Sequence, residues 1–588
     1  MPRTTRRHFL RHAGLAAGSV AVPWLPGWAQ PVSAGLPTLS GSDIALTVAH
    51  QTMAVDGRTH HAIGINGTVP APLIRLRQGQ RARITVTNTL AEDTSIHWHG
   101  LLLPFQMDGV PGISFPGIRP AETFVYDFPV IQAGTYWYHS HSGLQEQIGH
   151  YGPIVIDPDG SDPIAADREH VIVLSEHSPL HPHAIFRRLK LQGGYFNYQK
   201  QTLAGLLAGR DQSAKERVAW GAMRMDPSDI SDVTGATYTF LVNGQGPADA
   251  WTGLFKPGER VRLRFVNAAA MTIFNVRIPG CTLTIVQADG QDVRPVRVDE
   301  FQIAVAETYD VIVTPTEDRA YPLVAEASDR SGMARATLAP RAGMVAAFPA
   351  LRRRPLATMK DMGMGAGGHA EHGGTRADAA ACAPEHAAMG HCTPGGGAME
   401  HSMRDFAVAP EVARTPTVQT ISPMPVDRTG EPPQGLADAG HRVLVYRDLV
   451  AAARNPDLRA PSRQLRIHLT GNMERYMWAF DGVKLNEVKA PIPFRAGERV
   501  RVTLVNDTMM AHPIHLHGHF FELVTGHGDH APRKHTVNVA PGGTVTFDLT
   551  ADAVGDWAFH CHLLYHMHAG MMQVVTVREA ADAAERPA

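Results

Sequence analysis

One short pattern occurs three times in this chain, and it constrains the fold more than any other feature. The copies run over Gly79–Asn88, Gly258–Asn267 and Gly497–Asn506. Between the glycine and the asparagine, polar and apolar residues alternate, which is typical of a half-buried β-strand entered from a turn. A threefold repeat of this kind predicts three β-domains in succession. The length of 588 residues is sufficient for three or four domains.

The copies are unequally spaced, because the first two glycines are 179 residues apart and the last two are 239 residues apart. Residues 359–403 account for much of the difference. They contain no Leu, Ile, Val, Phe, Tyr or Trp and are rich in Gly, Ala, His and Met. Such a composition buries too little apolar surface to order itself, so we expect a flexible Met/His-rich insert between the second and third domains. A smaller insertion, at about 184–225, is expected to form short helices.

The N-terminus resembles a twin-arginine signal peptide. Arg6 and Arg7 precede Phe9-Leu10, a weakly apolar run and then the small-residue sequence Val32-Ser33-Ala34. No stretch reaches the roughly 18 apolar residues of a membrane span. We therefore expect export to the periplasm and no membrane insertion.

The amino-acid composition indicates a metal-binding protein. The chain has 54 basic and 56 acidic residues, so no net field favours nucleic acid as a partner. It has 32 His and 22 Met beside only 4 Cys. His and Met are borderline and soft metal ligands, and they far outnumber the cysteines that could form disulfides.

Four His-x-His sequences recur at equivalent places in the first and third domains. Residues two apart on a strand point to the same face, so each sequence presents two imidazoles together. The pairs are His97 with His99, His139 with His141, His515 with His517, and His560 with His562. If the two domains face each other, the eight imidazoles suffice for a three-metal cluster with room for a small oxidant.

A second metal site is predicted behind the last pair. Cys561 points away from its flanking histidines, and His512, His566 and Met571 lie at suitable spacings. A His2Cys set with an axial Met is typical of blue copper electron-transfer sites. The first domain has Thr94, Ser140, Gln145 and His150 at the equivalent positions and lacks this site. Zinc would leave the thioether and most of the histidines unexplained.

At these residues the chain resembles the multicopper oxidases, in the periplasmic copper-resistance branch. The motifs are His97-Trp98-His99-Gly100, His139-Ser140-His141, His512–Gly518 and His560–Met571, and similarity continues between them over nearly the whole mature chain. The resemblance implies an all-β fold of three cupredoxin-like Greek-key domains. We expect a signal peptide at 1–34, domains at 35–160, 161–345 and 436–588, and the insert with its linker at 346–435.

The resemblance also implies four copper ions. His97 and His515 would hold the type 2 copper, and His512, Cys561, His566 and Met571 the type 1 copper. The type 3 pair would be held by six histidines, which are His99, His139, His141, His517, His560 and His562. The implied reaction takes four single electrons, with Cys561 on the electron path, and reduces dioxygen to two waters.

Protons must also reach the cluster. Asp108 matches the acidic residue that the family places beside it, although an Asp-Gly sequence is equally typical of a turn. Many relatives have a second acid just after the last type 1 histidine, whereas this chain has Met567 and His568.

The electron donor is left open between Cu(I) and a phenol. Thioethers bind Cu(I), and the insert carries Met359, Met362, Met364, Met389, Met399 and Met403, with Cys382 and Cys392 among its histidines. Cuprous oxidation in copper resistance is the favoured interpretation. The alternatives are a laccase-type phenol oxidase and a periplasmic protein that sequesters copper. We expect a monomer.

Overall fold

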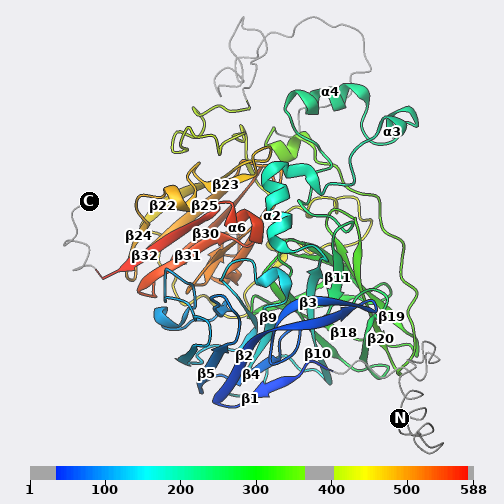
Figure 1. Ribbon diagram of the computed structural model, residues 1–588, viewed down its shortest axis with the longest axis vertical. Helices are drawn as coiled ribbons and strands as arrows, with labels where there is room; N and C mark the ends of the chain where they lie inside the picture. Colours follow the sequence, from blue (N-terminus) through cyan, green and yellow to red (C-terminus); the bar gives the residue numbers. More distant parts are fainter. Residues whose placement is uncertain (1–34, 365–402, 580–588) are drawn as a thin grey trace, which may run out of the picture.

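The computed structural model describes residues 35–364 and 403–579. The expected signal peptide and most of the expected insert, including Cys382, Cys392, Met389 and Met399, lie outside these residues. The regular structure of the described chain is mostly β-strand, arranged as three pairs of sheets (Figure 1). The expected all-β, three-unit architecture is confirmed. No helix among the described residues is long and apolar enough to cross a membrane.

The first unit (blue in Figure 1) packs a five-stranded sheet against a four-stranded sheet. The five-stranded sheet has the order β1 (Thr38–Ser40), β4 (Leu73–Arg77), β9 (Tyr151–Asp157), β8 (Gly134–His139), β6 (His97–His99). The other has the order β3 (Arg58–Ile65), β2 (Asp43–Val55), β5 (Arg81–Asn88), β7 (Thr123–Pro129).

The second unit pairs a six-stranded sheet with a five-stranded one. The first has the order β11 (Thr239–Val242), β10 (Arg168–His177), β13 (Val261–Asn267), β18 (Thr308–Val313), β15 (Leu283–Ala288), β16 (Gln291–Val298). The second has the order β12 (Trp251–Leu254), β20 (Met333–Ala339), β19 (Tyr321–Ala327), β14 (Phe274–Arg277), β17 (Glu300–Ile303). The expected short helices follow β10 and are α2 (Pro182–Leu191), α3 (Leu203–Leu207) and α4 (Ala214–Ala222).

The third unit repeats the plan. One sheet has the order β23 (Met477–Phe480), β22 (Arg463–Asn472), β25 (Arg499–Asn506), β30 (Gly543–Thr550), β27 (Phe521–Leu523), β28 (Arg533–Lys534), and β21 (Val426–Asp427) pairs with β30. The other has the order β24 (Ile492–Arg495), β32 (Met572–Arg578), β31 (Gly555–Cys561), β26 (His512–Leu516), β29 (Thr536–Val539). A short helix, α6 (Leu564–His568), follows β31.

The three repeat segments occupy equivalent positions. β5, β13 and β25 each pair in parallel with an earlier strand of their sheet (β2, β10 and β22) and antiparallel with a later one (β7, β18 and β30). The glycines that precede them, Gly79, Gly258 and Gly497, have φ of 88°, 88° and 73°, a backbone region that favours glycine. Each unit therefore enters its central strand through the same kind of turn.

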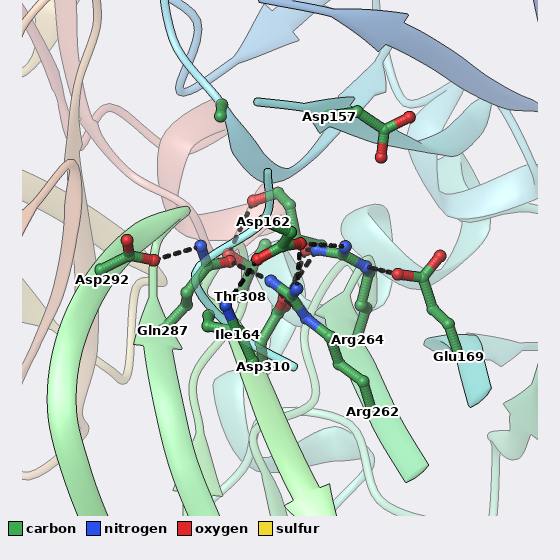
Figure 2. Close-up of polar contacts among 12 residues, drawn as sticks. Asp157, Asp162, Ile164, Glu169, Arg262, Arg264, Gln287, Asp292, Thr308 and Asp310 are labelled. Carbon is green, nitrogen blue, oxygen red and sulfur yellow. Dashed lines mark hydrogen bonds and ion pairs between the residues drawn. The ribbon is translucent and has the colours of Figure 1, made fainter. Parts of the chain in front are cut away.

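The contact between the second and third units differs in chemistry from the contact between the first and second units. The second and third units share one continuous apolar core, which also takes in Trp137, Leu144 and Tyr151 of the first unit, whereas most of the first unit packs around a core of its own. Beside the first unit, the second unit also carries a group of buried charges (Figure 2). Asp310 accepts hydrogen bonds from Arg262 Nε, Arg264 Nη1 and Thr135 Oγ1 of the first unit, each at 2.7 Å. Arg262, Arg264 and Asp310 belong to the second unit and are at most 2% exposed, so this ionic cluster, here called the ionic junction, is buried in the second unit and contacts the first unit through Thr135.

Candidate metal centre

The structure brings all eight predicted cluster histidines together between the first and third units. β6 pairs with β8 so that His97 lies opposite His139, and β26 pairs with β31 so that His515 lies opposite His560. The other four histidines come two residues later on each segment, and His141, His517 and His562 lie just beyond the ends of their strands. The strand pairing therefore presents four imidazoles from each unit to the junction.

The ring nitrogens of these histidines converge in sets of three. The sets whose ligand atoms lie within 4.8 Å of one another are His97, His99 and His515; His99, His139 and His562; and His97, His141 and His517. His560 joins them, because its Nε2 is 3.0 Å from Nε2 of His517. Each set mixes residues of the first and third units, so neither unit alone forms the site.

Six of the eight junction histidines have an inward nitrogen without a hydrogen-bond partner among the described residues. These nitrogens are buried and comprise Nε2 of His97, His139, His141, His515 and His562, together with Nδ1 of His99. A buried imidazole nitrogen without a partner is unfavourable unless something binds it. Imidazole nitrogen at this spacing is a good donor for copper, zinc, iron or nickel, so the residues fit a metal cluster.

The outward nitrogens are held by fixed partners. His97 Nδ1 donates to the Asp108 carbonyl at 2.8 Å, and His515 Nδ1 donates to the His535 carbonyl at 2.7 Å. His99 is reversed, since its Nε2 contacts Thr536 Oγ1 at 3.2 Å. Such partners select the tautomer and the ring orientation of a metal ligand.

Burial keeps most of these imidazoles neutral. It lowers the pKa of His99, His139, His141, His515, His517, His560 and His562, and neighbouring histidines lower it further for most of them. A neutral imidazole has a lone pair available for a metal, so no proton must leave these residues before binding near pH 7.

A separate three-residue site lies behind β31. Cys561 Sγ is 3.6 Å from His512 Nδ1 and 3.9 Å from His566 Nδ1, and the two nitrogens are 3.2 Å apart. All three residues are completely buried, and burial raises the pKa of the Cys561 thiol. Met571 is also buried, and its carbonyl accepts a hydrogen bond from the Cys561 amide. Cys561 is bonded through the backbone to His560 and His562, so the two sites are joined by a short covalent path.

The first unit has a hydrogen-bonded polar cluster where its metal site would be. Thr94 Oγ1 and Ser140 Oγ both donate to Gln145 Oε1, at 2.7 and 2.9 Å. His150 Nδ1 lies 3.4 Å from Thr94 Oγ1. These four residues stand at the positions equivalent to the mononuclear site. Thr94, Ser140 and Gln145 satisfy one another, whereas His150 Nε2 has no hydrogen-bond partner among the described residues.

Two buried carboxylates contact cluster histidines. Asp108 Oδ2 accepts a hydrogen bond from His517 Nδ1 at 2.9 Å, so this predicted residue lies beside the cluster. Glu146, which sequence reasoning missed, lies 2.7 Å from His139 Nδ1 and is 2% exposed. Burial and the charge of Glu176 raise the pKa of Glu146 well above its usual value.

The second unit contributes none of the junction histidines among its described residues. Two of its carboxylates, however, hold residues of the two sites in place. Asp232 accepts a hydrogen bond from His566 Nε2 at 2.7 Å and another from Tyr476. Asp289 accepts from the amides of His535 and Thr536, the residues that contact His515 and His99. Neither carboxylate stands in a recognisable motif, so only the tertiary structure reveals them.

Family models of the multicopper oxidases match residues 47–161, 211–344 and 459–581. The chain is 46% identical to copper resistance protein A of Escherichia coli, over 98% of this chain and all of the relative. This chain belongs to the multicopper oxidase family. It is also 30% identical to the multicopper oxidase MmcO of Mycobacterium tuberculosis, over 96% of both chains.

Other multicopper oxidases share the fold. A laccase from Botrytis aclada superposes with a TM-score of 0.62 at 20% identity, covering 94% of this chain and 90% of the laccase. Copper is the cofactor that membership of the family implies, and the converging imidazole and thiolate donors described above suit it.

Proposed function

We propose that this chain is a copper-resistance oxidase that takes electrons from Cu(I) and reduces dioxygen to water. The observation that supports it most strongly is the set of unpartnered, buried imidazole nitrogens that face one another beside Cys561. His512, Cys561, His566 and Met571 would hold a type 1 copper, and His97 and His515 a type 2 copper. The remaining six cluster histidines would hold a type 3 pair, which makes four coppers in all.

When bound, the coppers accept four single electrons and pass them to dioxygen, so that four Cu(I), one dioxygen and four protons give four Cu(II) and two waters. The protein supplies the path and the protons. Cys561 connects the donor side to His560 and His562 through the backbone. Asp108, hydrogen-bonded to His517, is the proposed proton relay beside the cluster.

A methionine cluster supports Cu(I) as the donor. Eight methionines pack with Trp220, and they are Met223, Met225, Met359, Met362, Met364, Met403, Met473 and Met509. They come from segments far apart in the sequence, including both ends of the expected insert. Met509 is completely buried and stands three residues before His512. Thioether sulfur is a soft ligand that selects Cu(I), so this cluster is the proposed approach to the type 1 site.

A phenol is the second candidate donor, and one cavity favours it. The cavity lies between the second and third units and is lined by Asp232, Met510, Leu563 and Tyr446, among others. Asp232 and Met510 adjoin the type 1 ligands. Against a phenol, His566 is fully buried, and Trp478 stacks on its ring at 3.8 Å.

The donor is tested by oxygen uptake with Cu(I) and with a phenol. Substituting Met223, Met359 and Met364 together by Leu keeps the apolar volume and removes three thioethers. We expect kcat/KM for Cu(I) to fall at least tenfold, with phenol turnover unchanged. Met53→Leu, a partly buried methionine of β2, is the matched control. Negligible Cu(I) oxidation by the parent, together with phenol turnover that the triple substitution leaves unaffected, would favour the laccase alternative. Unchanged Cu(I) oxidation in the triple variant would contradict the methionine cluster as the approach.

The sequestration alternative is tested through Cys561→Ser. In our proposal this variant loses blue absorption and turnover. Copper content well above four per chain, retained in the variant, would instead favour storage.

Export is proposed from Arg6 and Arg7, and their replacement by Lys is expected to leave the protein in the cytoplasmic fraction.

A further inference from the structure

Six histidines outside the proposed redox centres form three ring pairs on the first and second units, and the four exposed ones, His50, His61, His181 and His183, are called the histidine patch. The six are His50, His60, His61, His177, His181 and His183. They come from β2, β3, the end of β10 and the start of α2, and Figure 1 shows β3 and α2 in the same region of the molecule. The proposed oxidase reaction uses none of them.

The first pair lies on the β2–β3 hairpin. Strand register places His61 opposite Thr52 and His50 opposite Ile63, so His50 and His61 share one face. His61 Nε2 is 3.0 Å from His50 Nδ1, and both side chains are exposed. Two nitrogens bound at right angles, each about 2.0 Å from one metal ion, are about 2.9 Å apart. The same 3.0 Å spacing separates His517 and His560 in the cluster.

The second pair lies at the start of α2. The rings of His181 and His183 are 5.3 Å apart and nearly parallel, and both are exposed. The pKa of His181 is lowered by partial burial and by the neighbouring imidazoles of His183 and His61. The His181–His183 pair is therefore close enough to the His50–His61 pair to interact with it electrostatically. The nearby carboxylate of Glu92 acts in the opposite direction and adds negative charge beside the imidazoles.

The third pair lies on the other face of the hairpin from His50 and His61, because His60 and His61 are neighbours on β3. The His60 and His177 rings are 4.3 Å apart. His177 is 7% exposed, and its Nε2 has no hydrogen-bond partner among the described residues. Burial and His60 lower the pKa of His177 to about 4, which keeps this nitrogen available near pH 7.

We propose that the histidine patch binds a Cu(II) ion, with His50 and His61 as the chelating pair and His181 and His183 completing the site from α2. Imidazole suits divalent copper, zinc and nickel, and copper binds most tightly in that series. The ion bound here is separate from the proposed redox coppers and is not reduced or oxidised at this site.

The test uses the full chain carrying its redox coppers. Equilibrium dialysis against Cu(II) and electron paramagnetic resonance count the additional ions bound to the parent, to H50Q/H61Q and to H181Q/H183Q. We expect H50Q/H61Q to bind one Cu(II) fewer per chain. We expect H181Q/H183Q to bind that ion at least tenfold more weakly. H527Q, a partly exposed histidine of the third unit, is the matched control and is expected to behave as the parent.

Unchanged stoichiometry and Kd in either double variant would overturn the proposal, and His50 and His61 would then share only a hydrogen bond. Histidines of the undescribed residues are present in every variant, so their binding cancels in the comparison. Blue absorption and oxygen uptake are measured in the same samples. They should be unaffected, which separates failure of this proposal from failure of the proposed oxidase function.

Discussion

At the scale of single residues, the choice of ring nitrogen decides what the junction can bind. His97 and His99 are two residues apart and look equivalent in the sequence, yet the first presents Nε2 and the second Nδ1. The difference follows from the partners outside the junction, which are the Asp108 carbonyl and the Thr536 hydroxyl. Sequence spacing predicts the histidines but cannot predict these partners, because Thr536 belongs to a different unit.

Glu146 tests the importance of an outer partner. Replacing it by Gln keeps the shape and exchanges the carboxyl group next to His139 Nδ1 for an amide. Loss of such a partner typically lowers metal affinity about 10–100-fold. We expect Glu146→Gln to release cluster copper at a correspondingly lower chelator concentration, measured as copper retained per chain after dialysis. Glu122→Gln, at an exposed carboxylate of the same unit, is the control. Equal retention in the two variants would contradict a role for Glu146 in holding His139.

Cys561 makes the copper affinity of the mononuclear site depend on pH. Burial raises the pKa of its thiol, so the metal-free protein carries a proton on sulfur near pH 7. Binding copper as the thiolate displaces this proton, so affinity rises with pH, by about tenfold per pH unit when one proton is released. Titration of blue absorption against a copper buffer at several pH values measures it. A flat profile between pH 6 and 8 would mean that no proton leaves the thiol.

At the scale of elements, the asparagine that ends each repeat stabilises the loop after the strand in the same way in all three units. Asn88, Asn267 and Asn506 are fully buried, and each accepts a hydrogen bond from the amide two residues later. Each also donates to a carbonyl four or five residues on and to one in a distant loop or strand. The repeat pattern predicted one half-buried strand in each copy and three β-domains in succession. The buried role of the asparagine depends on distant carbonyls and was not predictable from it.

The loop design is tested by two matched substitutions. Removing a buried side chain that satisfies several backbone groups costs about 1–3 kcal/mol for each group left without a partner. We expect Asn267→Ala and Asn506→Ala both to lower the thermal unfolding midpoint. Only Asn506→Ala should also lower copper content, because its loop leads to His512. Equal copper loss in both variants would show that the effect is global unfolding rather than loop geometry.

At the scale of the whole molecule, the metal centre depends on how three similar units are held together. The second unit carries Val276 and Ile278 where the others carry His-x-His, and both are buried in its apolar core. Its contribution is to hold its neighbours through the shared core and through the ionic junction of Figure 2. The sequence predicted which units would meet at the metals. It did not predict the junction, because Arg262 and Arg264 occupy strand positions that alternation alone assigns to a polar surface.

Asp310 tests the ionic junction. Asp310→Asn leaves two buried guanidinium groups short of their shared carboxylate. Breaking a buried ion pair costs about 3–5 kcal/mol. We expect a comparable loss in the free energy of unfolding, measured by denaturant titration. Asp318→Asn, which breaks an exposed pair with Arg341, should cost about 1 kcal/mol or less. Equal stability of the two variants would contradict the junction's role.

The central claim is that the first and third units share one copper cluster beside a thiolate-bound copper. An anomalous-scattering map of copper-loaded crystals, collected at the copper edge, tests it directly. Our account predicts three peaks among the eight junction histidines and a fourth at Cys561. A map with no copper between the two units, or with those imidazoles directed away from each other, would contradict it.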